Sequence, residues 1–262
     1  MKEPITGVQL YTLRDYIQTK EDFDSTLQRL QTMGVRDIQI SAIGASITTN
    51  EIAETVRKYD MRVCVTHQSF ARLCKDLPAV IELHHAIGCD AVGLGYAPDE
   101  ERDTFEHAQQ FMEKLQGIAL ELQKHSLQFH YHNHDFEFRK IPGSDKTLMD
   151  LFLETDPSLI HLIPDVAWMH VAGHNPAKLL QQISDRVKVV HFKDYMPKED
   201  GRPRFVSLGQ GVVNLKECFA VCREKELPFI VYEQDDSWEN NDPFASTKTS
   251  LAYFEQLHHL QA

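Results

Sequence analysis

Short apolar runs alternate along the chain with longer stretches in which apolar residues recur at helical spacing. Eight runs have the length and β-branched content of buried strands, and they cover residues 7–12, 36–41, 62–66, 91–96, 127–132, 160–164, 187–192 and 229–232. A stretch of helical period follows each run, at residues 22–33, 50–59, 77–87, 105–122, 147–154, 176–183, 214–225 and 243–260. The pattern predicts eight consecutive strand–helix units.

The boundaries of these units carry the expected capping residues. Asn175 and Asp242 each precede a proline, which places a capping side chain before the first helical position. Gly34 and Gly88 lie where helices should end. Strict alternation implies parallel strands, and eight units favour closure, so we predict an α/β fold: a (β/α)8 TIM barrel formed by residues 1–262 as a single domain.

Composition narrows the class of protein. No apolar run approaches the roughly 18 residues of a membrane span, and a net charge of −12 disfavours nucleic acid and anionic membranes as partners. Five cysteines without a CxxC pair suggest reduced thiols in the cytoplasm. The chain starts without a secretory signal, although a removed leader would leave no trace. Whether the protein forms a homo-oligomer is open at this point.

Histidine is the unusual residue: the chain has fourteen, and seven lie between His130 and His191. In a barrel of this kind the chemistry occupies the C-terminal ends of the strands. The predicted strand ends carry acidic and basic side chains that could act there, and these are His67, His132, His134, Glu137, Asp165, His191, Lys193 and Glu233. We therefore expect one polar pocket at this end of the barrel.

A metal site is the simplest explanation for this concentration of charge. Carboxylates that converge on one pocket repel one another unless a divalent cation neutralises them. We expect the ligands to be Glu137, Asp165, His191 and Glu233, and this donor set suits one Mn²⁺, Mg²⁺, Co²⁺ or Zn²⁺ ion. His132 is the alternative to Glu137, since a neutral imidazole is an adequate donor for Mn²⁺ or Zn²⁺. Side-chain alternation puts the two residues on opposite faces, so the choice of Glu137 requires the regular strand to end by about residue 135.

The long connection over residues 195–213 holds two prolines and three glycines, and we expect it to cover the pocket when substrate binds.

The tripeptide His132–His134 also occurs in His-Asn-His nucleases, but those place it on a hairpin followed by a helix. The parallel-strand context and the acidic balance argue against that alternative.

Several segments together resemble the xylose isomerase-like sugar phosphate isomerase/epimerase superfamily over nearly the full length of the chain. The superfamily includes ketose 3-epimerases, hydroxypyruvate isomerases and inosose dehydratases. The segments that carry the resemblance are Val8–Arg14, Tyr131–Phe138, Asp165–Trp168, Ala172–Pro176, His191–Asp194, Leu208–Gly211 and Tyr232–Gln234.

The resemblance implies a (β/α)8 barrel with one catalytic Mn²⁺-type ion held by Glu, Asp, His and Glu from the last four strands. Asp165, His191 and Glu233 match three of these positions. The chain departs from the common pattern twice, with His132 where many relatives have glutamate and Trp168 where many have histidine. These departures weaken the transfer of any particular epimerase mechanism.

We expect a metal-dependent isomerase or epimerase of a sugar or sugar derivative, acting by proton transfer through an enediolate. Glu233 would transfer one proton and Glu137 or His134 the other. His67, His132, Trp168 and Lys193 would contact a carbohydrate substrate, and no dedicated phosphate site is evident.

Three other functions are considered, and the net charge disfavours the last of them. The same proton abstraction could expel a leaving group, which would make the protein a dehydratase or lyase of a keto-sugar or keto-glycoside. A non-catalytic sugar-binding barrel is also compatible with the sequence. The apurinic-site endonuclease branch shares the fold but needs a basic groove that a net charge of −12 disfavours.

Overall fold

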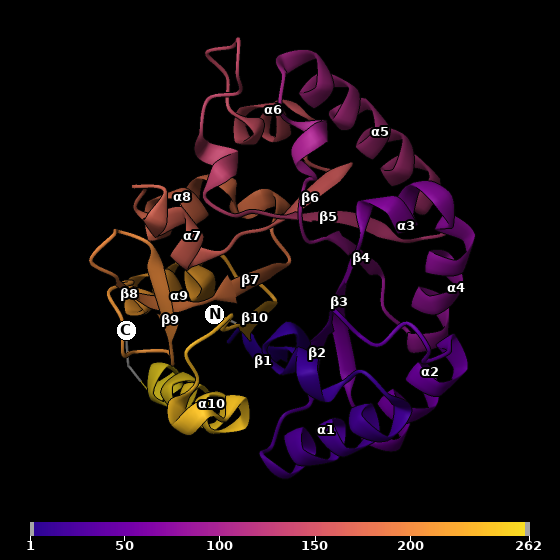
Figure 1. The fold of residues 1–262 in the computed structure, drawn as a ribbon, viewed down its shortest axis with the longest axis vertical. Helices are drawn as coiled ribbons and strands as arrows, with labels where there is room; N and C mark the ends of the chain where they lie inside the picture. Colours follow the sequence, from indigo (N-terminus) through magenta and orange to yellow (C-terminus); the bar gives the residue numbers. More distant parts are fainter. Residues whose placement is uncertain (1–2, 260–262) are drawn as a thin grey trace.

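Eight parallel strands form a nearly closed barrel with helices around its outside (Figure 1). The structure is a computed structural model and describes residues 3–259. The barrel strands are β1 (Ile5–Gln9), β2 (Asp37–Ile40), β3 (Arg62–Gln68), β4 (Ala91–Leu94), β5 (Gln128–His132), β6 (Ile160–Ile163), β7 (Val189–Phe192) and β10 (Phe229–Tyr232). Neighbours pair in the order β6-β5-β4-β3-β2-β1-β10-β7, and bridges from Leu162 to Val187 and from Asp165 to His191 link the two outermost strands. The predicted fold class is confirmed.

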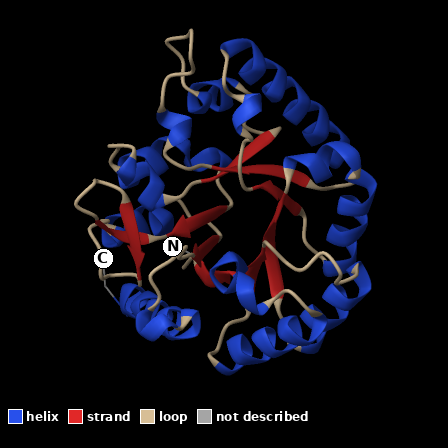
Figure 2. Cartoon of the chain, in the orientation of Figure 1, coloured by secondary structure: helices blue, strands red, loops and turns tan. Residues whose placement is uncertain are grey.

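Helices connect the strands and cover the outer face of the barrel (Figure 2). The α-helices are α1 (Lys20–Thr32), α2 (Thr49–Lys58), α3 (Phe70–Lys75), α4 (Leu77–Ile87), α5 (Phe105–Lys124), α6 (Leu148–Glu154), α7 (Val166–Val171), α8 (Pro176–Ile183), α9 (Leu215–Glu224) and α10 (Pro243–His259). Short 3₁₀ segments are η1 (Leu10–Tyr16), η2 (Asp99–Glu101), η3 (Phe136–Phe138), η4 (Ser184–Arg186) and η5 (Glu239–Asn241). The predicted end of the last helix at Leu260 lies outside the described residues.

The core lies between the barrel and its helices, and α5 shows how the sequence builds it. Seven of the eight residues in its predicted apolar stripe are buried, and Phe105 is partly buried. The seven are Ala108, Phe111, Met112, Leu115, Ile118, Ala119 and Leu122. Asn175 accepts a hydrogen bond from the Lys178 amide at the start of α8, and Gly88 ends α4 in the left-handed conformation, with a φ of 66°. Both capping predictions are therefore confirmed.

Two segments differ from the predicted elements. The first strand ends at Gln9, because Gln9 caps η1 by accepting a hydrogen bond from the Tyr11 amide. The connection after β7 contains an antiparallel hairpin, β8 (Asp194–Pro197) and β9 (Pro203–Val206). The hairpin continues from the end of β7 and forms a separate two-stranded sheet (Figure 1). The sequence predicted only a long loop there.

None of the helices in the described range of the chain is long and apolar enough to cross a membrane. All five cysteines are free thiols, and four of them are buried. Burial raises the pKa of Cys64, Cys89, Cys218 and Cys222, so these four side chains act as small apolar core residues.

Candidate active site

The C-terminal ends of the barrel strands bring four buried donor residues together. One ligand atom each from His132, Asp165, His191 and Glu233 lies within 4.8 Å of the other three. His132 and His191 belong to β5 and β7, whereas Asp165 lies two residues after β6 and Glu233 one residue after β10. Strands placed side by side in a parallel sheet end at one edge, so residues far apart in the sequence meet there. We call this set the four-residue group.

The fourth member of the group is His132 and not Glu137. Glu137 accepts hydrogen bonds from the Tyr131 hydroxyl at 2.6 Å and from the His134 amide at 2.7 Å. Tyr131 precedes His132 on β5, so its side chain points to the opposite face of the strand. Since η3 folds Glu137 back against Tyr131, its carboxylate lies away from the group, and the expectation that Glu137 is a ligand does not fit this geometry.

Glu137 is fully buried and stabilises the turn after β5. Burial raises the pKa of this carboxyl to about 7, although the hydrogen bonds from Tyr131 and His134 act in the other direction. The same placement removes Glu137 from the cavity, so it cannot act there as the second proton carrier that the sequence suggested.

Asp165 has two roles, one for each carboxylate oxygen. Its Oδ1 accepts hydrogen bonds from the Ala167 and Trp168 amides, both at 2.9 Å, and so caps α7. Its Oδ2 is buried and accepts no hydrogen bond from the described residues. The Lys193 ammonium faces Oδ2 at 3.3 Å as an ion pair. One oxygen of Asp165 is thus committed to the fold and the other is directed at the group.

Hydrogen bonds orient both imidazoles of the group. His132 donates from Nδ1 to the Ile163 carbonyl at 3.3 Å, which leaves the lone pair on Nε2 for a ligand. The Nε2 of His191 lies 2.7 Å from Oε1 of Gln39, and its Nδ1 lies 2.8 Å from Oε2 of Glu233. The amide oxygen of Gln39 and the carboxylate of Glu233 both accept, so each ring nitrogen of His191 faces an acceptor. With Nε2 donating to Gln39, Nδ1 could bind a cation instead of donating to Glu233.

Lys193 supplies the positive charge among the carboxylates. It is 1% exposed, and its Nζ lies 3.1 Å from Glu233 and 3.0 Å from Asp235. Burial opposes the charged ammonium, but the carboxylates of Asp235, Glu233 and Asp165 outweigh it and hold the pKa of Lys193 well above its usual value. Burial likewise opposes the charged form of Glu233, yet Lys193 and His191 keep its pKa below the usual range.

These residues fit a divalent cation. Two carboxylates and two imidazoles are a mixed oxygen and nitrogen donor set, which suits Mn²⁺, Mg²⁺, Co²⁺ or Zn²⁺. The buried Oδ2 of Asp165 accepts no hydrogen bond from the described residues and has only the Lys193 ion pair, so it is the kind of atom that a metal ion would satisfy. A His/Asp/Glu cluster that can hold a metal is therefore present.

His67 and His134 lie beside the group and line the same cavity. Burial is the main cause that lowers the pKa of each to about 3, with His191 adding to the effect at His67 and Lys193 adding to it at His134. Both imidazoles are therefore neutral at physiological pH. Nε2 of His67 and Nδ1 of His134 have no hydrogen-bond partner among the described residues.

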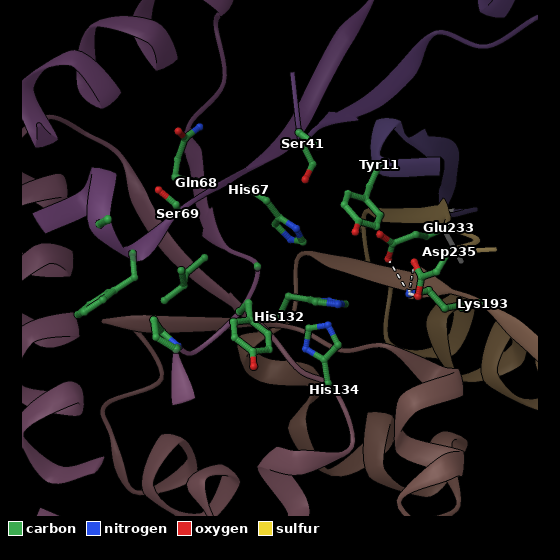
Figure 3. A pocket seen from close by; sticks show the side chains of 17 residues that line it. Tyr11, Ser41, His67, Gln68, Ser69, His132, His134, Lys193, Glu233 and Asp235 are labelled. Atoms are coloured by element: carbon green, nitrogen blue, oxygen red, sulfur yellow. Dashed lines mark hydrogen bonds and ion pairs between the residues drawn. The ribbon is translucent and has the colours of Figure 1, made fainter. Parts of the chain in front are cut away.

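A cavity of about 720 Å³ opens above the group (Figure 3). Lys193, Glu233 and Asp235 lie along one side of it, and His67, His132 and His134 lie near its centre. Trp168 is not among the lining residues. Its ring packs against His134, with 5.5 Å between centroids, and against Phe205 at 5.2 Å.

The sequence did not single out Gln39 as a site residue, although it carried a signal. Gln39 is a fully buried glutamine in the four-residue strand β2, where every neighbour is buried too. A buried amide needs hydrogen-bond partners, and His191 is the partner of the Gln39 oxygen, whereas the Gln39 nitrogen has none among the described residues. Asp235 lies two residues after Glu233, and the structure pairs its carboxylate with Lys193.

The comparisons with known proteins agree with this architecture. The sequence profile of the xylose isomerase-like TIM barrel family matches residues 27–257. The chain belongs to that family. A related sequence, the inosose dehydratase of Geobacillus kaustophilus, is 26% identical over 221 residues, which are 75% of this chain and 70% of the relative.

Solved structures extend the likeness in fold. A sugar phosphate isomerase/epimerase from Parabacteroides distasonis superposes with a TM-score of 0.80 at 19% identity, covering 97% of this chain and 98% of the other. An L-ribulose 3-epimerase gives a TM-score of 0.73 at 14% identity over 98% of this chain and 94% of the other. A xylose isomerase-like TIM-barrel protein from Mycobacterium smegmatis, solved with magnesium, gives 0.73 at 13% identity, covering 98% of each chain.

Proposed function

We propose that this protein is a metal-dependent dehydratase of a keto-sugar or related keto-polyol. The reaction removes a proton from the carbon beside a ketone and expels the hydroxyl group on the next carbon as water. The observation that carries the proposal is the position of Glu137, whose carboxylate is buried behind β5 against Tyr131. The cavity therefore has its carboxylates on one side only, at Glu233 and Asp235 (Figure 3).

Carboxylates on only one side of the cavity suit an elimination better than an epimerisation. An epimerase must remove a proton from one face of a carbon and return one to the opposite face, which takes two proton carriers. An elimination in which proton and hydroxyl leave from the same face needs one carrier, because the group that accepts the proton can pass it to the departing oxygen. Glu233 is our candidate for that carrier, since it lines the cavity and Lys193 keeps it ionised.

His132, Asp165, His191 and Glu233 would hold the divalent cation. When bound, such an ion polarises a ketone and stabilises the negative charge that develops on its oxygen. His67 and His134 would orient the substrate as neutral imidazoles, and Gln39 would keep His191 in the tautomer that can bind a cation. The relatives named inosose dehydratase support this reaction class.

A sugar isomerase or epimerase is the second candidate. His134 lines the cavity away from Glu233, and its Nδ1 has no partner among the described residues, so it could supply the second proton carrier. The fold shared with an L-ribulose 3-epimerase is compatible with this alternative.

A product analysis separates the two candidates. Protein loaded with Mg²⁺ is incubated in D₂O with keto-inositols and ketoses, and the products are examined by NMR and mass spectrometry. The proposal predicts loss of water from a keto-inositol or keto-sugar. Deuterium incorporation into an epimer or isomer without loss of water would contradict the dehydratase and favour the second candidate.

Two variants link the reaction to the site. Glu233→Gln should lower kcat by about 10²–10⁴-fold, the usual contribution of a general base. Glu137→Gln is the matched control, because it makes the same change in a carboxylate that lies outside the cavity. If the two variants lost activity equally, Glu233 would not be the proton carrier.

A further inference from the structure

The cavity extends well beyond the four-residue group. Its far side, which we call the distal half, lies across His67 from Lys193 and Glu233 (Figure 3). The distal half comprises residues that follow β3 and β4, together with the ends of those strands: Gln68, Ser69, Phe70, Ala71, Leu94, Gly95, Tyr96 and Pro98.

The size of the cavity exceeds the needs of one sugar ring. Its volume of about 720 Å³ is in the upper part of the range of roughly 300–1,000 Å³ found for sites that enclose drug-sized ligands. A single keto-hexose or keto-inositol is smaller than such ligands. If its reacting carbon lies beside Glu233, the distal half is left for another part of the substrate.

The charges around the cavity indicate what that part is not. Among the described residues that line the cavity, Lys193 is the one cation, and its ammonium is already paired with Asp165, Glu233 and Asp235. The residues of the distal half carry no ionisable acid or base except the phenol of Tyr96. The guanidinium groups beside the distal half already donate hydrogen bonds, Arg72 to Gln68 and Arg102 to Tyr96 and Asp99. No cation without a partner lines the distal half among the described residues, so the second part of the substrate should be uncharged.

The distal half offers the mixture of contacts that a neutral polyol ring requires. The Oγ of Ser69 accepts a hydrogen bond from the Arg72 backbone amide, and the Ser69 hydroxyl hydrogen can still be donated to a ligand. The Gln68 amide donates to Thr66 and accepts from Arg72, and it has one further donor and one further acceptor position. Phe70 and Tyr96 add aromatic rings, against which the apolar C–H faces of a sugar can pack.

We propose that the natural substrate is a keto-sugar joined to a second, uncharged ring, such as a neutral glycoside, and that the distal half binds this second ring. The inference rests on the proposed function for the site beside Glu233. It adds a substrate class: a molecule of two rings without phosphate, whose first ring carries the ketone.

The test compares two substrates that differ only in the second ring. One is a free keto-hexose, and the other is the same keto-hexose in glycosidic linkage to glucose. Loss of the proton beside the ketone is followed by NMR in D₂O with Mg²⁺-loaded protein. We expect kcat/KM for the linked compound to be at least about tenfold higher, which corresponds to roughly 1.4 kcal/mol of added binding.

A bulky side chain that fills the distal half should remove the preference for the linked compound. Ala71 is exposed on α3 and lines the cavity, so Ala71→Trp can fill the distal half without entering the core. It should lower the ratio of kcat/KM for the linked compound to that for the free compound by about tenfold. Ala252→Trp, at an exposed position on α10, is the matched control and should leave the ratio unchanged. Circular dichroism serves as the check that both variants are folded.

Each other outcome counts against the inference. Equal or better turnover of the free keto-hexose, or a ratio that Ala71→Trp leaves unchanged, would overturn the two-ring substrate while the proposed function stood. If neither these compounds nor the keto-inositols of the product analysis lost the proton, the proposed function itself would fail and the inference with it.

Discussion

His132 is the residue that decides the composition of the proposed metal site. It presents Nε2 to the group because Nδ1 donates to the Ile163 carbonyl, and it occupies the place where the sequence suggested Glu137. Loss of an outer-shell partner of a metal ligand costs about 10–100-fold in affinity, so loss of the ligand itself should cost at least the upper value. We therefore expect His132→Ala to weaken Mn²⁺ binding by about 100-fold or more.

Glu137→Gln is the control for this prediction, because the Glu137 carboxylate binds Tyr131 and the His134 amide instead of the group. Its Mn²⁺ affinity, measured by isothermal titration calorimetry, should stay close to that of the unmodified protein. A Glu137→Gln protein that lost the metal while His132→Ala kept it would reverse the assignment.

The ionisation of Glu137 should instead change the free energy of unfolding with pH. Burial raises its pKa from the usual 4.5 to about 7, so the folded state favours the protonated acid. Its contribution is fully present below pH 4.5 and is lost as the pH rises towards 7. The shift corresponds to about 3 kcal/mol across this window.

The measurement compares urea unfolding of the unmodified protein and Glu137→Gln between about pH 4.5 and 7.5. The free energy of unfolding of the variant, relative to the unmodified protein, should increase with pH by up to about 3 kcal/mol. The buried histidines, whose lowered pKa values act in the opposite direction, are common to both proteins and cancel. A constant difference would mean that Glu137 does not titrate in this range.

At the scale of elements, Asp194 organises the connection that follows β7. Its carboxylate accepts hydrogen bonds from the amides of Tyr195, Gly209, Gly211 and Val213. The stretch from Ser207 to Val213 is thereby tied to the start of the β8–β9 hairpin. Gly211 is required at its position because a Cβ there would overlap Oδ1 of Asp194.

Asp194→Asn should loosen this connection, because one amide oxygen cannot accept all four hydrogen bonds and the amide nitrogen would face backbone donors. We expect a loss of about 2–4 kcal/mol in the free energy of unfolding and faster proteolysis within residues 198–213. Asp200→Asn, on the exposed tip of the same hairpin, is the control and should change neither quantity. Equal effects of the two variants would contradict the role of Asp194.

The sequence predicted the barrel because the apolar pattern repeats in every unit, as the buried stripe of α5 illustrates. It did not predict β8 and β9, since these short strands depend on Asp194 and on each other more than on local apolar residues. Asp165, His191 and Glu233 were recognisable from their places at strand ends. The position of the Glu137 carboxylate could not be predicted, because alternation does not show where β5 ends or which way η3 turns.

At the scale of the whole molecule, metal binding should stabilise the fold, because the ligands come from four separate strand ends. A ligand present at 100 times its Kd adds about 2.7 kcal/mol to the stability of the state that binds it. For a chain of this size the expected rise in Tm is about 5–10 °C. Differential scanning calorimetry with Mn²⁺ and with EDTA measures the difference.

His132→Ala should lose this shift, whereas Glu137→Gln should keep it. A metal that raised the Tm of all three proteins equally would bind elsewhere on the surface, where a net charge of −12 provides many carboxylates.

The most direct test of the account is the fate of the proton beside the ketone when Mg²⁺-loaded protein acts on a keto-inositol or keto-sugar in D₂O. We expect NMR to show metal-dependent loss of this proton together with loss of water, and we expect Glu233→Gln to slow both by about 10²–10⁴-fold. Retention of the proton, or its loss at an equal rate in Glu233→Gln or with EDTA, would contradict the claim that this site forms an enolate through Glu233.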